Sequence, residues 1–200
     1  MTLRHVFAAT VLLATMTLSA SALAAPPAPQ LPVARIASPG DVLAVEVTTD
    51  QDGRPSYAVS RLGKPVIAPS RLGFIFIDAP KFERHFAISG QKTRTFDETW
   101  EQPWGERRSI RNHYNELRVT LAETKALKRR YDVVFRVYDD GVGFRYEFPD
   151  QPTLKEVKIG EELTEFTIAE PATAWWIPAG LWNREEYLYH RTPAEEVGDA

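Results

Sequence analysis

The chain contains no cysteine, which excludes disulfide bridges and any metal site built on thiolates. It also lacks a phosphate-binding glycine-rich loop and the G-x-S-x-G turn of serine hydrolases. His85, His113 and His190 show no metal-ligand spacing. No window of about twelve residues carries a helical period, which argues against a helical fold.

A strong positive charge is missing as well. The formal net charge is −3, and this mildly acidic balance predicts that nucleic acid is not a partner. Beyond the N-terminal region no apolar run approaches the roughly 20 residues that a membrane-spanning helix needs. We therefore expect the mature chain to have no membrane association.

The N-terminus has the pattern of a secretory signal peptide. Arg4 and His5 precede the apolar run 6–18, and an A-x-A cleavage signal follows at 22–24. The alternative is an uncleaved membrane anchor, which needs a longer apolar run. We predict a signal peptide at residues 1–24 and a secreted protein, with the bacterial periplasm as its compartment.

Two further regions follow the signal peptide. Residues 25–37 are rich in proline and alanine, which predicts an extended tether without a core of its own. Residues 38–200 have the length of one ordinary domain, which can bury a hydrophobic core without disulfides or a structural metal.

Many short segments of this domain are typical of strands separated by turn residues. The apolar run 72–78 predicts a strand buried on both faces, and Asp139-Asp140-Gly141 is the strongest hairpin signal. No final strand is evident in the segment 172–199. The fold class that this pattern predicts is all-β, an antiparallel β-sandwich. The expected strands are 41–49, 55–61, 66–68, 72–78, 84–89, 92–100, 116–123, 131–138, 143–148, 153–159 and 163–168.

The stretch 100–116 differs from ordinary core sequence. Pro103 and Gly105 interrupt any helix, and its charges fall on both faces of any regular strand. We predict a structured corner that leads into a strand beginning near Asn115 and that presents polar and aromatic groups from a rigid scaffold.

All five tryptophans lie at or after position 100. An indole ring in a cleft is a plausible platform for a sugar ring, and Trp100, Trp104 and Trp182 are our candidate substrate-binding residues. The alternative, which the average burial of tryptophan favours for most of them, is packing in the core or between domains.

Two groups of carboxylates need an interpretation. Glu106 and Glu116 lie near His113 in the sequence, but the arginines among them favour structural ion pairs over acid–base catalysis. The segment 183–187 carries an amide and two carboxylates, oxygen ligands that suit calcium. Two carboxylates cannot fill the six to eight positions around that ion, so a solvated loop is the better interpretation of these residues alone.

Several ordered motifs resemble the N-terminal domain of glycoside hydrolase family 97. They are YAVSRLGKPVIAPSRLG at 57–73, WEQPWGERRSIRNHYNE at 100–116, FRVYDDGVGFRYEFP at 135–149, TEF at 164–166, AWW at 174–176 and EYLYHRTP at 186–193. The resemblance covers about residues 38–198.

This resemblance implies a β-super-sandwich of the galactose-mutarotase type from an exported bacterial α-glucosidase or α-galactosidase. It implies two partners, an α-linked oligosaccharide and a (β/α)8 catalytic barrel that carries the catalytic carboxylates. It also implies calcium as a cofactor, held mostly by that barrel and not bound tightly by this chain alone. Glu186 matches the position that contributes to calcium, with Glu185 as an alternative. No catalytic residue is expected in this chain.

The chain stops at about the point where the family's first domain would join the barrel. We therefore expect a fragment or a truncated chain that is inactive alone, shaping an active site that it does not complete. The alternatives are a free-standing carbohydrate-binding module and, with less support, an enzyme that resembles an aldose 1-epimerase.

Overall fold

A computed structural model describes residues 32–125, 127–169, 171–178, 180 and 186–198 of the chain. These residues belong to one compact unit, Leu31–Ala200. The predicted signal peptide 1–24 and most of the predicted tether lie outside the described residues. Within the described ranges, no helix has the length and apolar character needed to span a membrane.

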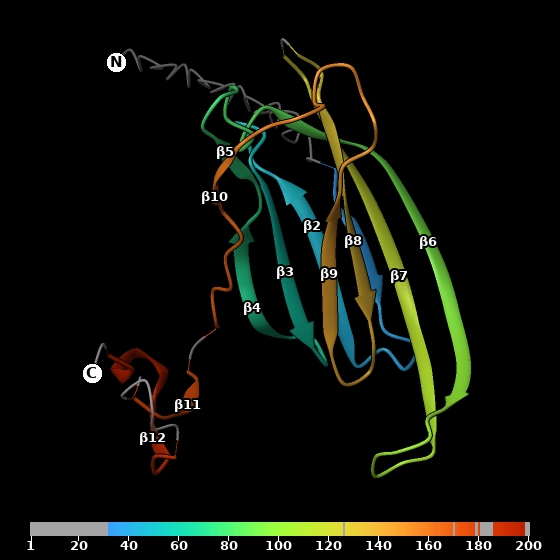
Figure 1. Cartoon of the computed structure of the whole chain (residues 1–200), viewed down its shortest axis with the longest axis vertical. Helices are drawn as coiled ribbons and strands as arrows, with labels where there is room; N and C mark the ends of the chain where they lie inside the picture. Colours follow the sequence, from blue (N-terminus) through green and yellow to red (C-terminus); the bar gives the residue numbers. More distant parts are fainter. Residues whose placement is uncertain (1–31, 126, 170, 179, 181–185, 199–200) are drawn as a thin grey trace, which may run out of the picture. The chain divides into compact units, whose positions relative to one another are not determined.

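Two four-stranded antiparallel sheets form a sandwich (Figure 1). Neighbours in each sheet are also neighbours in the chain, so both sheets are simple meanders. The all-β antiparallel prediction is confirmed. The first sheet consists of β1 Ala34–Ala37, β2 Leu43–Thr49, β3 Pro55–Arg61 and β4 Lys64–Arg71, and the second of β6 Phe86–Glu101, β7 Ser109–Glu123, β8 Arg130–Val137 and β9 Val142–Glu147.

Alternation along the strands builds the core between the sheets. Every second residue of β2 is buried, and the same period places Leu117 and Val119 of β7 inside. Tyr57 of β3 meets the opposite sheet, with its ring centroid 5.7 Å from that of Phe135 and 5.2 Å from that of Phe144. The predicted hairpin at 139–141 joins β8 to β9, where the Tyr138 N–H donates to the Gly141 carbonyl at 2.8 Å.

Two small sheets complete the described structure. Strand β5 (Phe74–Phe76) pairs with β10 (Ile159–Glu162), and β11 (Thr173–Trp176) pairs with β12 (His190–Pro193), which a 3-10 turn, η1 Ala194–Glu196, follows. The expectation that the segment 172–199 has no final strand is therefore wrong. So is burial of 72–78 on both faces: β5 ends at Phe76, and Ile77 is 74% exposed.

The segment 163–169 lies along the free edge of β4. The Ala68 N–H donates to the Thr167 carbonyl at 2.8 Å, and the Ala169 N–H donates to the Val66 carbonyl at 3.0 Å. The predicted strand 163–168 is thus an extended segment that caps the first sheet. The predicted strand 153–159 is wrong except at Ile159, because its apolar residues pack against the core from a loop.

Two boundaries also differ from the sequence-based expectation. Strand β1 lies inside the segment 25–37, so folded structure begins before residue 38. Ala34 is fully buried. Four residues, two of them alanines, are too few to reveal an alternating pattern next to several prolines.

The second correction concerns the stretch 100–116, which is a hairpin and not a corner. Strand β7 begins at Ser109 instead of near Asn115, and a short loop joins it to β6. Strand β8 pairs with β7 only from Asn115 onward, so the end of the β6–β7 hairpin projects beyond β8 and β9 (Figure 1). We call residues 97–113 the hairpin arm. Both faces of this arm are exposed to solvent, so charged residues occur at odd-numbered and at even-numbered positions.

Candidate functional site

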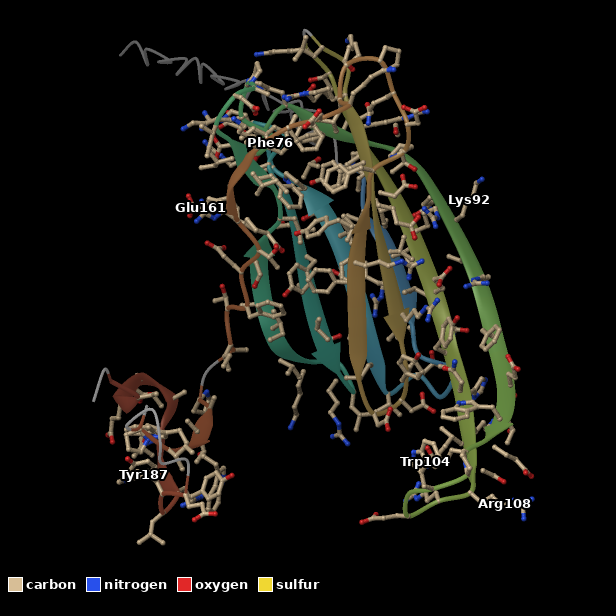
Figure 2. The ribbon with its side chains drawn as sticks, viewed as in Figure 1. Phe76, Lys92, Trp104, Arg108, Glu161 and Tyr187 are labelled. Carbon is tan, nitrogen blue, oxygen red and sulfur yellow. The ribbon has the colours of Figure 1, made fainter. Side chains whose placement is uncertain are left out.

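The tip of the hairpin arm holds Trp104 outward. Its side chain is 80% exposed and lines a hollow of about 500 Å³ together with Glu101, Gln102, Pro103, Gly105 and Arg108. Figure 2 shows Trp104 and Arg108 together at this end of the molecule. Packing in the core of this domain, which average burial favours for tryptophan, is therefore wrong for Trp104.

Hydrogen bonds hold the tip in shape. The Gln102 N–H donates to the Arg108 carbonyl at 2.9 Å, and the Gln102 side chain donates to the Arg107 carbonyl at 2.7 Å. The Arg108 guanidinium donates twice to one Glu101 oxygen, at 3.1 and 3.0 Å. An exposed aromatic ring beside a fixed ion pair is an arrangement that can bind a polar ring with an apolar face.

Trp100 lies on the same arm but not in this hollow. It sits on β6 opposite Ile110 and is 47% exposed, so it is a surface residue of the arm. The third candidate, Trp182, lies outside the described residues, as does Glu185, the alternative calcium ligand. The structure therefore brings Trp100 and Trp104 onto one projecting element and describes no contact between them.

Glu186 is exposed and belongs to a second hollow, of about 760 Å³. The lining is mainly aromatic and aliphatic and comprises Ile177, Pro178, Glu186, Tyr187, Leu188, Tyr189 and His190. The small β11–β12 sheet supports it: Trp176 donates its indole N–H to the Thr192 hydroxyl at 3.2 Å, and its ring lies 5.0 Å from that of His190.

Calcium can be tested against these residues. The ion takes six to eight oxygen ligands, and one carboxylate supplies two at most. Within the described part of the chain, no group of three or more His, Asp or Glu side chains is arranged to hold a metal. Glu186 is accessible and chemically suited as a single ligand, but the described residues do not form a complete calcium site.

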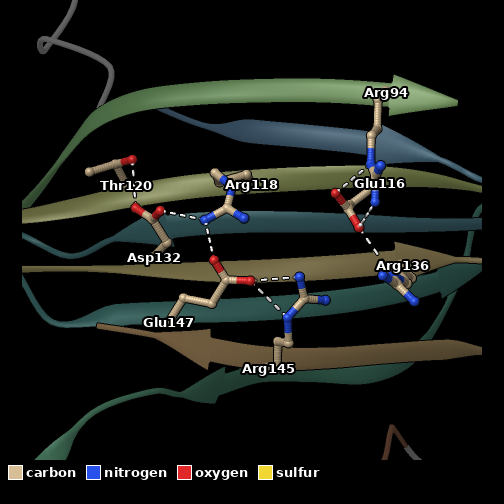
Figure 3. Close-up of polar contacts among 8 residues, drawn as sticks. All are labelled: Arg94, Glu116, Arg118, Thr120, Asp132, Arg136, Arg145 and Glu147. Carbon is tan, nitrogen blue, oxygen red and sulfur yellow. Dashed lines mark hydrogen bonds and ion pairs between the residues drawn. The ribbon is translucent and has the colours of Figure 1, made fainter. Parts of the chain in front are cut away.

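The outer face of the second sheet carries an ordered network of charges (Figure 3). Glu116 of β7 accepts two hydrogen bonds from Arg94 of β6, at 2.7 and 3.0 Å, and one from Arg136 of β8 at 3.1 Å. A second cluster joins Arg118 to Asp132 and Glu147, with Arg145 also bonded to Glu147. Glu116 and Asp132 face arginines on neighbouring strands, whereas Glu147 of β9 binds Arg145 on its own strand and Arg118 on β7, across β8.

These contacts decide the role of Glu116. The hydrogen bond from Arg94 lowers the pKa of the Glu116 carboxyl, and Arg136 adds to the effect. A carboxylate kept ionised in this way is a poor general acid. The structure thus agrees with the ion-pair interpretation of Glu116, although its partners are Arg94 and Arg136 and not the arginines that adjoin it in sequence. Glu106 is exposed at the tip of the arm.

Comparison with known protein families places nearly all the described residues in one match. Residues 36–200 match the family model described as glycosyl-hydrolase 97 N-terminal. A probable retaining alpha-galactosidase of Streptomyces bingchenggensis is 32% identical over 153 residues, 76% of this chain and 22% of that protein. A retaining alpha-galactosidase of Bacteroides thetaiotaomicron is 24% identical over 139 residues, 70% of this chain and 19% of that protein.

Solved structures of glycoside hydrolases are also similar to this chain. A glycoside hydrolase family 97 enzyme from Pseudoalteromonas sp. strain K8, in complex with panose, is similar with a TM-score of 0.74 and 41% identity. The match covers 82% of this chain and 25% of that one. A beta-arabinopyranosidase is similar with a TM-score of 0.65 and 27% identity over 72% of this chain and 23% of that one. The chain thus spans about a quarter or less of each of these proteins.

Proposed function

Because the chain belongs to the glycosyl-hydrolase 97 N-terminal family, we propose that it is the sugar-binding, active-site-shaping first domain of an exported α-glycosidase. Its partners are a (β/α)8 catalytic domain and an α-linked oligosaccharide. The signal-peptide pattern at residues 1–24 supports export to the bacterial periplasm. The catalytic carboxylates belong to the catalytic domain, so this chain alone is inactive.

The observation that carries this proposal is an apolar surface around Glu186. Ile177, Leu188 and Tyr189 line the hollow together with Glu186 and are 38%, 89% and 72% exposed. Exposed apolar groups gathered in one short region mark a surface that another protein or a ligand covers. The family resemblance makes a catalytic domain the expected partner for this surface. If that domain covers the surface, Glu186 lies at the interface between the two domains.

The hairpin arm supplies the other part of the proposal. Trp104 presents an indole face beside the Arg108–Glu101 ion pair, and Trp100 adds a second exposed ring on the same strand pair. Planar polar groups next to an aromatic ring suit the hydroxyls and the apolar face of a sugar. Trp100, Trp104 and Trp182 are the substrate-binding residues we propose.

A chimera tests whether the chain functions as such a domain. Replacing the N-terminal domain of the Pseudoalteromonas sp. strain K8 enzyme with residues 32–200 of this chain should retain hydrolysis of α-glycosides. The same enzyme without any N-terminal domain should lose it, since one wall of the cleft is missing. A folded chimera with no more activity than the truncated enzyme would contradict the proposal.

For calcium, we propose that Glu186 contributes one carboxylate to an ion held mainly by the catalytic domain. In the chimera, Glu186→Gln should weaken calcium binding by about 10- to 100-fold, because the substitution removes a charged ligand. Glu195→Gln is the matched control, an exposed carboxylate on η1 that should leave the affinity unchanged. Isothermal titration calorimetry with calcium measures both, and equal affinities would reject the role of Glu186.

A further inference from the structure

Strand β6 is the edge of the second sheet and is paired on one side only among the described strands. It is 16 residues long, and almost every side chain from Gln91 to Glu101 is exposed. By contrast, the segment 163–169 covers the edge of β4. About half of the backbone N–H and C=O groups of an edge strand point away from its neighbour and are free to pair with another strand.

The charges along this edge are arranged in two blocks. Lys92 and Arg94 precede Phe96, and Asp97, Glu98 and Glu101 follow it. Charged side chains, especially lysine, commonly protect an exposed edge from pairing, and charges of the same sign on two copies repel each other. Here the first half of the exposed edge is positive and the second half is negative, so an antiparallel copy of the strand meets the opposite charge.

We propose that β6 pairs with β6 of a second copy of this chain, in antiparallel register centred on Phe96. The result is a continuous eight-stranded sheet across a two-fold axis. The proposal does not depend on the proposed function, because it rests only on the edge and its charge pattern.

Geometry restricts the register. A two-fold axis perpendicular to the sheet keeps the core faces of both copies on the same side. Directly opposite residues must then be both odd-numbered or both even-numbered, so at the axis one residue lies opposite its own copy. A centre at Arg94 would oppose two arginines, and a centre at Asp97 would oppose two aspartates. Like charges directly opposite each other destabilise a strand pair.

A centre at Phe96 avoids both conflicts. It places Arg94 opposite Glu98 of the second copy twice, Lys92 opposite Trp100 twice, and the two Phe96 rings opposite each other. Ion pairs, cation–π contacts and aromatic pairs of this kind each stabilise adjacent strands. Arg94 keeps its contacts with Glu116 through Nε and Nη2, and a guanidinium has five donors, so it can bind both carboxylates.

The register can be tested by cross-linking, since the chain has no native cysteine. In the proposed register, Thr93 lies opposite Thr99 of the second copy, within reach of a disulfide. The double variant Thr93→Cys/Thr99→Cys should form a covalent dimer under mild oxidation. Either single variant should not, because its two cysteines would lie roughly 20 Å apart along the strands. A double variant that stays uncrosslinked, or single variants that crosslink equally, would overturn the proposal.

Sedimentation equilibrium of the whole chain tests the association itself. We expect a reversible dimer whose dissociation constant rises by about tenfold or more in Glu98→Lys, where the introduced ammonium group faces Arg94 of the second copy. Glu106→Lys makes the same charge change at the exposed arm tip, outside the pairing, and should leave the constant unchanged. Far-UV circular dichroism checks that each variant is folded. A chain that sediments as a monomer at all concentrations, or equal effects of the two substitutions, overturns the proposal.

Discussion

Replacing Arg129 with alanine should destabilise the chain by about 3–5 kcal/mol, because it leaves a buried carboxylate without its partner. The Arg129 side chain is 1% exposed and donates to both oxygens of Glu123, from Nε at 2.8 Å and from Nη2 at 2.6 Å. Its remaining bonds go to the carbonyls of Pro80 and Lys81, at 2.9 and 3.0 Å.

The same guanidinium also packs on the core. It lies 4.7 Å from the centroid of the Phe82 ring, a contact that adds cation–π attraction to the hydrogen bonds. Arg129 therefore joins three parts of the structure: the end of β7 at Glu123, the loop at 80–81, and the aromatic cluster around Phe82. An alanine would leave two backbone carbonyls and one carboxylate in apolar surroundings.

Urea denaturation of this variant and of a matched control measures the effect. Arg130→Ala removes a neighbouring arginine whose residue is exposed, and it should change the free energy of unfolding by less than about 0.5 kcal/mol. The double variant Arg129→Met/Glu123→Leu should be less destabilised than Arg129→Ala, because no unpaired charge remains. A loss below about 1 kcal/mol for Arg129→Ala would show that the buried pair contributes little.

Replacing Gly53 with alanine should cost roughly 2–5 kcal/mol, for a reason that lies entirely in the backbone. Gly53 has a φ of 71°. A Cβ atom there would lie 2.6 Å from the nitrogen and 2.7 Å from the oxygen of Phe86, and 2.8 Å from the Cα of His85. A left-handed conformation costs roughly 1–2 kcal/mol for a residue with a Cβ, and forced packing typically adds about 1–3 kcal/mol.

The neighbouring contacts explain why this loop cannot simply move away. The Phe86 N–H donates to the Gly53 carbonyl at 2.9 Å, and the His85 N–H donates to the Asp52 carbonyl at 2.9 Å. These bonds attach the β2–β3 turn to the start of β6. Displacing the turn would therefore break hydrogen bonds that position the long edge strand.

Gly63 provides the control, because it separates the conformational cost from the clash. Its φ is 77°, close to that of Gly53, but a Cβ there meets nothing within 4 Å. Gly63→Ala should cost only about 1–2 kcal/mol. Thermal and urea denaturation of both variants give the comparison. Equal losses would mean that the close approach to Phe86 has no energetic weight.

Much of the fold could be predicted from the sequence because its determinants are local. Alternation with a period of two predicts the strands 55–61 and 116–123, and Asp139-Asp140-Gly141 predicts the turn between β8 and β9. Each of these signals lies within about ten consecutive residues, and backbone geometry alone links it to the structure. The all-β class follows from them together with the absence of a helical period.

The candidate site was only partly accessible in this way. Tryptophan and glutamate could be named as chemical types, but their exposure could not, and average burial is a poor guide for Trp104. The stretch 100–116 was misread for a related reason. A strand that extends beyond its neighbours has no buried face, so its sequence loses the alternation that identifies a strand.

Only the tertiary structure determines which side chains pair with each other across neighbouring strands. Glu116 pairs with Arg94 and Arg136, which lie 22 and 20 residues away, and not with the arginines close to it in the sequence. Arg129 is the least exposed charged residue among the described residues, because β7, a loop and an aromatic cluster pack around it. Which side chains face each other depends on strand register and sheet order, and these are set by the packing of the whole core and not by any one segment.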